Sequence, residues 1–466
     1  MRFVTRAACA VLLTLAAYVS TGCGDKGTEP EKDKPSPTWR HQWSKRFGDA
    51  SGQYARAVAA DTSGNSIVTG YFFGTVDFGG GTLTSAGAFD IFLAKFGPTG
   101  AHVWSKRFGD GSEQTVQGVV VDEAGNVIIA GYFEGAIDFG GGNLTSAGLR
   151  DVFVAKFGSD GSHIWSKRFG DTNYQAANAL ALDSSGNVII TGVFMGTVNF
   201  GGGVLTSAGS WDVFAAKFDS GGNHVWSKRF GDGNHQYAPA VAVDGLDNVF
   251  VAGYFVGTVD FGGGVLTSAG GEDIFLAKFD SGGGHQWSKR FGDISTDQEV
   301  WGVAIDGSGN AIIAGYFTGA VDFGGGALPN AGPNADIFVA KFGSDGAHVW
   351  SKSFGDTYAQ TAYGVAVDPS DNVLVAGGFN GTVNFGGGTL TSAGYKDAFL
   401  AKLSPGGAHI WSKRFGDADF QDVQAVTTDI SGNAFIAGYF SGTINFGGGT
   451  LTSAGGEDLF LAKFGQ

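Results

Sequence analysis

Trp104-Ser-Lys-Arg-Phe-Gly-Asp110 is one copy of a stretch that recurs along most of the chain. Its tryptophan returns at intervals of 61, 61, 61, 61, 63 and 61 residues. A fixed period of this size indicates one supersecondary unit used repeatedly, because a unit this short cannot close a core alone and must share one with its neighbours. The seven copies are marked by Trp43, Trp104, Trp165, Trp226, Trp287, Trp350 and Trp411.

One unit contains four strand-like segments separated by turns. Gln117–Asp122 is an apolar run that ends in the tight turn Glu123-Ala-Gly-Asn126, and Asn126–Phe133 follows as a strand rich in β-branched and aromatic residues. After a long glycine-rich connection come the third and fourth strands, Asp151–Phe157 and His163–Phe169. Four antiparallel strands per unit predict a blade, so the fold class is all-β and the architecture a seven-bladed β-propeller.

The two ends of the repeat region predict how the ring closes. The region begins with a fourth-strand motif, His41–Phe47, and finishes with a third strand, Asp458–Phe464. The last blade therefore lacks its outer strand, while the start of the chain carries a spare one. We expect the two to pair, which satisfies both free edges and sets the number of blades at seven.

The N-terminus reads as an export signal. Arg2 and Arg6 precede the apolar stretch Ala7–Val19, which is too short to span a bilayer comfortably and suits a signal peptide. The chain is therefore divided into a signal peptide (1–22), a tether (23–38) and a propeller (39–466). Cleavage would remove Cys9 and leave Cys23 as the single cysteine, so no internal disulfide is expected.

The segment Val19-Ser-Thr-Gly-Cys23 resembles a bacterial lipobox, although Ser20 stands where that pattern prefers leucine. The resemblance implies lipidation of Cys23 and anchoring in a membrane by several acyl chains. Ordinary signal cleavage beside a bystander cysteine is the alternative. Gly24–Thr38 contains no large apolar side chain and is predicted to be a solvated tether. Gly24, rather than aspartate, after the cysteine favours the outer membrane by analogy with known sorting rules.

Composition supports the fold and excludes some partners. The chain has 82 Gly and 40 Phe but only 9 Pro, as expected for many short strands, tight turns and aromatic packing. Its formal net charge is −15, and such a surface repels nucleic acid and anionic lipid. Nucleic-acid binding is therefore disfavoured.

Two sequence resemblances point to the same architecture. Ala155–Trp165 has Ala, Gly and Trp at the spacing of the tryptophan-docking motif of quinoprotein propellers, in which the Trp packs between adjacent blades. The run Asp-x-x-Gly-Asn-Val, followed by Asp-x-Phe-x-Ala-Lys-Phe and Trp-Ser, more closely resembles the bacterial SBBP repeat, a seven-bladed propeller repeat. It covers residues 39–466 and implies little about activity, because that family is defined by its scaffold.

Repeated polar residues are interpreted as structural. Seven histidines each precede a motif tryptophan by two positions, so the ring should hold them apart and no two could share an ion. The recurrent aspartates look like turn caps, and no acidic cluster unique to one blade is visible in the sequence. Calcium at the Asp-rich loops stays an open alternative, although no EF-hand or nonapeptide spacing occurs. The seven histidines are His41, His102, His163, His224, His285, His348 and His409.

Lysine and arginine also follow the repeat. Twenty of the 29 cationic residues occupy three repeated positions, and Ser353 replaces the arginine in one unit. We expect them to pair with repeated carboxylates in exposed, individually weak ion pairs rather than to bind phosphate. No catalytic residue, cofactor or metal ligand is predicted.

Variation between the units suggests where a ligand binds. After each Phe-Gly-Asp the residues vary around a recurrent glutamine, and the residue before each third strand varies too, whereas the strands are nearly copied. These connections leave the second and fourth strands, which run in the same direction, so they lie on one face. Drift of unconstrained loop tips is the bland alternative. We expect the aromatic residues among them to be exposed loop tips, which favour recognition of sugars or protein. The candidate ligand face comprises Tyr54, Tyr174, Trp211, Tyr237 and Tyr358.

The sequence thus predicts a cell-envelope lipoprotein that acts as a binding scaffold for an envelope polysaccharide, peptide or protein. The alternatives are an enzyme with its site in the central channel, such as a polysaccharide lyase or hydrolase, and a purely structural envelope protein.

Overall fold

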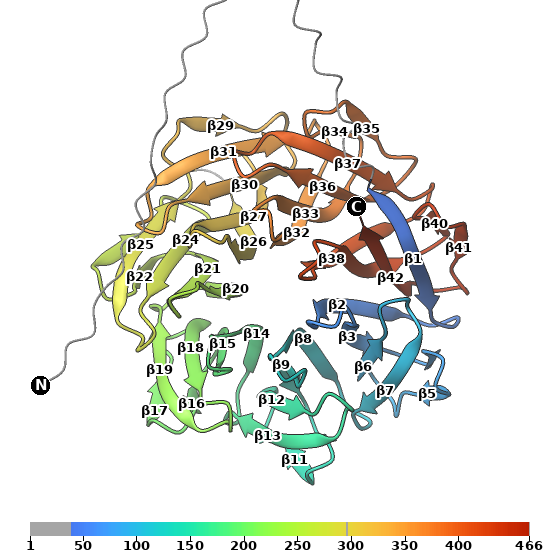
Figure 1. Ribbon diagram of the computed structural model, residues 1–466. Coiled ribbons are helices and arrows are strands. Elements are labelled where there is room, and N and C mark those ends of the chain that lie inside the picture. The colour runs from blue at the N-terminus through green and yellow to red at the C-terminus, as the bar shows by residue number, and fades with distance from the viewer. Residues whose placement is uncertain (1–38, 295–296, 466) are drawn as a thin grey trace, which may run out of the picture. The chain divides into compact units, whose positions relative to one another are not determined.

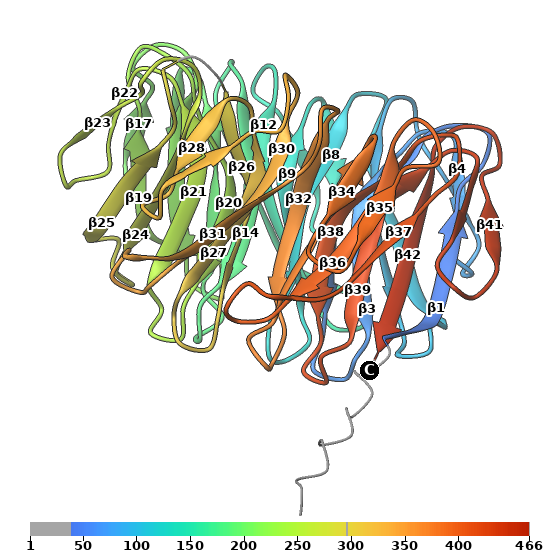
Figure 2. The same cartoon turned by 90° about the horizontal axis from the view of Figure 1, so that it is seen from above.

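The computed structural model describes residues 39–294 and 297–465, and every regular element in them is a β-strand. Seven four-stranded antiparallel sheets are arranged as blades around a common axis, which confirms the predicted fold (Figure 1). Figure 2 shows the ring from the side, with strands running between its two faces. Within this part of the chain no helix has the length and apolarity needed to cross a membrane.

Each blade is ordered from an innermost to an outermost strand. The innermost strands are β2 (Gln53–Ala60), β8 (Gln114–Val121), β14 (Gln175–Leu182), β20 (Gln236–Val243), β26 (Gln298–Ile305), β32 (Gln360–Val367) and β38 (Gln421–Thr428). The second strands are β3 (Ser66–Phe72), β9 (Val127–Phe133), β15 (Val188–Phe194), β21 (Val249–Phe255), β27 (Ala311–Phe317), β33 (Val373–Phe379) and β39 (Ala434–Phe440). The third strands are β6 (Asp90–Phe96), β12 (Asp151–Phe157), β18 (Asp212–Phe218), β24 (Asp273–Phe279), β30 (Asp336–Phe342), β36 (Asp397–Leu403) and β42 (Asp458–Gly465). The outermost strands are β7 (His102–Phe108), β13 (His163–Phe169), β19 (His224–Phe230), β25 (His285–Phe291), β31 (His348–Phe354), β37 (His409–Phe415) and β1 (Arg40–Phe47).

The hydrophobic core lies between blades rather than within them. The third strands are buried along their whole length because a blade covers each of their faces, so both alternating sets of side chains are apolar. Leu93 of one blade, for example, belongs to the same buried cluster as Ile129 and Phe153 of the next. A single blade therefore could not bury its own apolar surface, as the repeat length predicts.

The motif tryptophan joins neighbouring blades, as its resemblance to the docking motif implies. Trp104 Nε1 donates to the carbonyl oxygen of Ser159 in the next blade at 3.0 Å. Gly161, in the same turn, has a φ of +82°, and a Cβ there would lie 3.1 Å from the indole ring. Glycine is thus required both for the turn and for the close approach of the ring.

Ring closure follows the predicted pairing. β1 pairs antiparallel with β42 from Arg40↔Gly465 to Phe47↔Leu459 and supplies the missing outer strand of the last blade. Trp39 lies just before β1 and is 6% exposed. Its ring packs on that of Trp411, with the ring centroids 4.4 Å apart. The blade next to Trp411 is the one closed by β42 and β1, so it has no turn between its third and fourth strands. Trp39 takes the place of that turn against Trp411.

The long glycine-rich connection contains structure that the sequence interpretation did not foresee. In every blade it forms a short two-stranded hairpin, as in β4 (Thr75–Asp77) paired with β5 (Thr82–Thr84). Asp77 Oδ1 caps this hairpin by accepting from the backbone N–H of Gly79 and Gly81. The other six hairpins are β10 (Ala136–Asp138) with β11 (Asn143–Thr145), β16 (Thr197–Asn199) with β17 (Val204–Thr206), β22 (Thr258–Asp260) with β23 (Val265–Thr267), β28 (Ala320–Asp322) with β29 (Ala327–Pro329), β34 (Thr382–Asn384) with β35 (Thr389–Thr391), and β40 (Thr443–Asn445) with β41 (Thr450–Thr452).

The repeated cations pair with repeated carboxylates as expected, but the expectation of exposed pairs is wrong. Lys95 Nζ lies 3.1 Å from Asp61 Oδ2, and both side chains are buried. Arg107 reaches Asp90, which is fully buried. Removing one partner of such a pair leaves an uncompensated buried charge, which is far costlier than losing a surface pair.

The repeated histidines have structural contacts. His102 Nε2 lies 3.1 Å from Ser105 Oγ, and its ring meets Phe96 edge-on. Its ring also packs beneath the hairpin glycines, where a Cβ on Gly80 would clash with it. Among the described residues there is no group of three or more potential ligands arranged to hold a metal ion.

Candidate binding site at the mouth of the central channel

The recurrent glutamine holds the loop frame. Gln53 is completely buried at the start of β2, where its Nε2 donates to Asp49 Oδ1 at 2.8 Å and to the carbonyl oxygen of Phe73 at 3.0 Å. Asp49 also accepts from Thr75 N–H and Oγ1 of the hairpin. Burial opposes ionisation of Asp49, but the hydrogen bonds from Thr75, Ser51 and Gln53 outweigh it and lower its pKa to about 2. The same glutamine and aspartate contacts recur in other blades, as in Gln114 with Asp110, although Ala136 there offers only its backbone N–H.

Residues that vary between the units lie next to this frame, at each junction between blades. The backbone N–H of each recurrent glutamine donates to the carbonyl oxygen of the residue that precedes the third strand of the previous blade, as in Gln53 N–H to Glu457 at 2.8 Å. These seven residues, here called the mouth residues, are held in equivalent places by the same bond. They are Phe89, Arg150, Trp211, Glu272, Ala335, Lys396 and Glu457.

A second variable ring lies deeper in the channel. In all seven innermost strands the register with the second strand shifts near the residue three positions after the glutamine, as between Ala55 and Ala57 in β2. Such a β-bulge re-aims a side chain. The residues at this position, here called the bulge ring, all line one cavity of about 350 Å³, and they are Arg56, Gln117, Asn178, Pro239, Trp301, Tyr363 and Gln424.

The cavity has a polar side and an aromatic side. Arg56 donates from Nη1 to Gln424 Oε1 at 2.9 Å and from Nη2 to Gln117 Oε1 at 3.1 Å. On the other side, the ring centroid of Trp301 lies 6.4 Å from that of Tyr237 and 5.9 Å from that of Tyr363. Blades of one half thus provide the amides and a guanidinium, and blades of the other half provide most of the rings, with Tyr439 added by the blade of Gln424.

Two charged clusters flank the cavity. Glu272 and Glu299 come from adjacent blades and act on each other electrostatically, and Trp301 Nε1 donates to Glu299 Oε2 at 3.1 Å. Burial, together with the charges of Glu299 and Asp297, raises the pKa of Glu272 to about 7. The sequence interpretation found no such acidic cluster. It was missed because its members lie in different repeats and meet only across a junction.

The second cluster is a buried ion pair. Lys396 Nζ lies 2.6 Å from Asp422 Oδ2, and Asp422 is 1% exposed. Burial lowers the pKa of Lys396, but the charge of Asp422 outweighs it and the net shift is upward. Lys396 also lies over the Tyr363 ring at 4.9 Å.

The five residues of the predicted ligand face occupy different depths. Tyr174 and Trp211 directly precede two strands of one blade, β14 and β18, and pack together with ring centroids 5.8 Å apart. Tyr358 stands at a loop tip and is 58% exposed. The expectation that Tyr54 and Tyr237 are exposed tips is wrong, because both lie in innermost strands: Tyr54 packs on Tyr71 and Tyr439, and Tyr237 lines the cavity. That this face binds a ligand stays a prediction.

The bulge ring was missed, although the sequence carried a signal for it. Its position varies between the seven innermost strands, but the residue directly after the glutamine varies as well, so variation alone did not single it out. The predicted lipidation site Cys23, the signal peptide and the tether lie outside the described residues.

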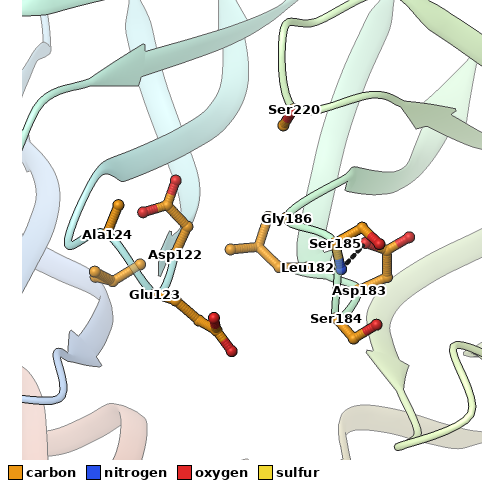
Figure 3. Close-up of a pocket in the computed structure, with 10 residues that line it drawn as sticks. Asp122, Glu123, Ala124, Leu182, Asp183, Ser184, Ser185, Gly186 and Ser220 are labelled. Atoms are coloured by element: carbon orange, nitrogen blue, oxygen red, sulfur yellow. Dashed lines mark hydrogen bonds between the residues drawn. The ribbon is translucent and has the colours of Figure 1, made fainter.

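The opposite face offers a groove of another kind. Between two blades a cavity of about 270 Å³ is lined by the turns that follow β8 and β14, including Asp122, Glu123 and Asp183 (Figure 3). Ser185 N–H donates to Asp183 Oδ1 within one of these turns. A similar groove lies between the turns that hold Asp61 and Glu123. These grooves repeat with the copied turn residues, so we interpret them as a consequence of the repeat rather than as a specific site.

Comparisons with known proteins agree in fold only. No family model matches the chain, so membership of the SBBP repeat family stays a prediction. The chain is 22% identical to an uncharacterized WD repeat-containing protein of Acanthamoeba polyphaga mimivirus, over 74% of this chain and 31% of that protein. It is 25% identical to the regulatory protein FlaEY of Caulobacter vibrioides, over 77% of this chain and 40% of that protein. The chain thus spans about a third to two fifths of the length of these curated relatives.

Among solved structures, the chain is similar to the WD40 β-propeller domain of Doa1, with 10% identity, a TM-score of 0.43 and coverage of 92% of this chain and 98% of that one. A protein of unknown function from Dyadobacter fermentans gives the same identity and TM-score, with coverage of 92% and 99%.

Proposed function

We propose that this chain is a lipid-anchored binding protein of the bacterial cell envelope, whose propeller presents the channel mouth to an envelope polysaccharide, peptide or protein. The observation that carries the proposal is the placement of variation. The third and fourth strands, the turn caps and the loop frame recur with little change in the seven blades. In contrast, the mouth residues differ at the blade junctions, and the bulge ring differs around one cavity.

Unconstrained drift does not account for this pattern. Drifting positions should be exposed and without specific contacts. Arg150, in contrast, pairs with Glu113 at 3.1 Å and Glu134 at 3.2 Å, and it lies over the Tyr132 ring at 4.6 Å. Trp211 stacks on His235 with centroids 6.1 Å apart. These junctions thus build their own arrangements of aromatic and charged groups, and aromatic residues and arginine are enriched in binding hot spots.

A scaffold role also fits the relative named as a WD repeat-containing protein, since propellers of that kind serve as rigid platforms for other molecules. The second candidate is a polysaccharide lyase or hydrolase with its site in the channel, where Glu272 and Glu299 would be the paired carboxyl groups.

The envelope location rests on the sequence of residues 1–38 alone. A signal-like segment, a lipobox-like Cys23 and a polar tether would place the propeller outside the cytoplasm, bound to a membrane through its N-terminus. The acidic surface would then face other envelope components rather than the anionic lipid itself.

The test is a comparison of the two faces of the ring. Isolated envelope polysaccharide and envelope protein fractions are titrated with the purified chain and with the double variant Tyr174→Ala/Trp211→Ala. The matched control is Leu246→Ala, because Leu246 is 82% exposed on a turn of the opposite face. We expect binding at least 10-fold weaker in the double variant and unchanged in the control. Full binding by a folded double variant, or loss in the control, would exclude the mouth as the site.

A further inference from the structure

The bulge ring presents more hydrogen-bond donors than the described residues can satisfy. Arg56 donates to the side-chain oxygens of both Gln117 and Gln424, and the amide NH₂ groups of these glutamines are further donors in the same ring. In the neighbouring blade, Asn178 Nδ2 is a buried donor with no partner among the described residues. Buried polar groups are normally satisfied, so this donor in the cavity wall calls for an acceptor from outside.

The charge of Arg56 is also without an ion-pair partner in the part of the chain that the structure describes. The buried acid of this side of the channel, Asp422, is already engaged by Lys396 at 2.6 Å. The charge of Arg56 also affects Tyr237 in the opposite half of the ring of blades. Burial raises the pKa of Tyr237, and the Arg56 charge opposes that rise. On a chain of net charge −15, this cavity thus contains a guanidinium that forms no direct ion pair within the described residues.

The facing wall suits a ring-shaped ligand. Trp301 is held in place by its hydrogen bond to Glu299 and packs between Tyr237 and Tyr363. Aromatic faces accept the C–H groups of a sugar ring, while amides and phenols take its hydroxyl groups as donors or acceptors. The cavity volume of about 350 Å³ is within the range of small-ligand sites.

We propose that the channel binds an acidic sugar, with its carboxylate on Arg56 and the adjoining amide donors and its ring against Trp301. This inference rests on the proposed function, because it names the ligand class that the channel mouth would admit. A peptide C-terminus carries the same carboxylate. The sugar is favoured because three amides and the phenols of Tyr237, Tyr316, Tyr363 and Tyr439 surround the cavity, a density of polar groups that matches a ring of hydroxyls rather than a peptide side chain.

The experiment titrates the purified chain by calorimetry with four probes: trigalacturonate, the neutral maltotriose, inorganic phosphate, and a short peptide with a free C-terminus. We expect trigalacturonate to bind, and maltotriose and phosphate to bind at least 10-fold more weakly. Arg56→Gln should weaken trigalacturonate by about 10- to 100-fold, the usual effect of losing a charge-assisted hydrogen bond. Trp301→Ala should weaken the acidic and the neutral sugar alike.

Controls separate binding from folding. Lys106→Gln removes a cation from the outer strand β7 and should leave binding unchanged. Should Arg56→Gln unfold, Arg56→Lys keeps the charge but loses the two-pronged geometry, and it should bind trigalacturonate weakly. The inference would be overturned if trigalacturonate did not bind, or if maltotriose bound as tightly as trigalacturonate. It would also be overturned if phosphate or the peptide bound as tightly or more tightly, or if Arg56→Gln left the binding of trigalacturonate unchanged.

The two proposals fail in different ways. If the Tyr174→Ala/Trp211→Ala chain keeps full envelope binding, the proposed function fails, while the trigalacturonate titration still decides the channel ligand. If Arg56→Gln binds trigalacturonate like the natural chain, the channel inference fails whatever the envelope assay gives.

Discussion

One blade lacks an ion pair that the other six keep, and restoring it should stabilise the ring. Ser353 stands where six blades have the arginine that reaches the buried aspartate of the third strand, as Arg414 reaches Asp397. Asp336, 2% exposed, is left with a hydrogen bond from Ala331 N–H and no cationic partner among the described residues. Burial, together with the charge of Asp356, raises the pKa of Asp336 to about 6.

The expected gain in stability follows from this shift in the pKa of Asp336. The ordinary pKa of the group is 3.8, so the folded chain holds this proton more tightly than the unfolded chain does. Its contribution to stability is complete below pH 3.8 and is lost as pH rises through about 6. The loss at pH 7 is up to about 3 kcal/mol, at ~1.4 kcal/mol per pKa unit. For a domain of about 430 residues, this corresponds to roughly 3 °C in melting temperature.

We therefore expect Ser353→Arg to raise the melting temperature by up to about 3 °C at pH 7.5 and by little at pH 4, where Asp336 is protonated. Differential scanning calorimetry at both pH values measures this. Ser353→Gln is the matched control, since it adds a long side chain without charge. The reverse variant Arg414→Ser should lose stability at pH 7.5. The same gain at both pH values, or an equal gain in Ser353→Gln, would refute the electrostatic explanation and leave packing as the cause.

Three further outcomes are expected. A chain that begins at Ala50 should aggregate, or melt at a far lower temperature than the natural chain. Losing β1 removes about seven ladder hydrogen bonds at ~1 kcal/mol each and exposes the edge of β42. A melting temperature equal to that of the full domain would contradict closure of the ring by β1. Cys23→Ser should move the protein from membranes to the soluble fraction, and sedimentation with membranes after a salt wash would exclude the lipid anchor. Lys396→Met should lower the free energy of unfolding by about 3–5 kcal/mol, because it leaves the buried Asp422 charge without its partner. In chemical denaturation, Lys396→Met/Asp422→Leu should recover most of the lost free energy. No recovery would mean that lost packing, and not the charge, is responsible.

The amino-acid sequence alone was sufficient to predict the blade, the number of blades and the closing strand. These depend on local patterns and on their repetition: a strand period, a glycine turn and a tryptophan that returns every 61 residues in most units. The orphan strand at each end, His41–Phe47 and Asp458–Phe464, then left one pairing that satisfies both edges. The recurrent glutamine was likewise visible as a loop frame, and its hydrogen bonds confirm that interpretation.

Only the tertiary structure decided which variable residues meet. Glu272 and Glu299 are brought together because the backbone N–H of Gln298 binds the Glu272 carbonyl across a blade junction, a contact that no repeat contains within itself. Arg56 and Gln424 are 368 positions apart and touch only because the ring closes. Repetition makes the strands predictable because each blade solves the same packing problem. The site resists prediction from sequence for the same reason: it is formed by the differences between blades, and those differences act on one another only after the ring has placed them around one axis.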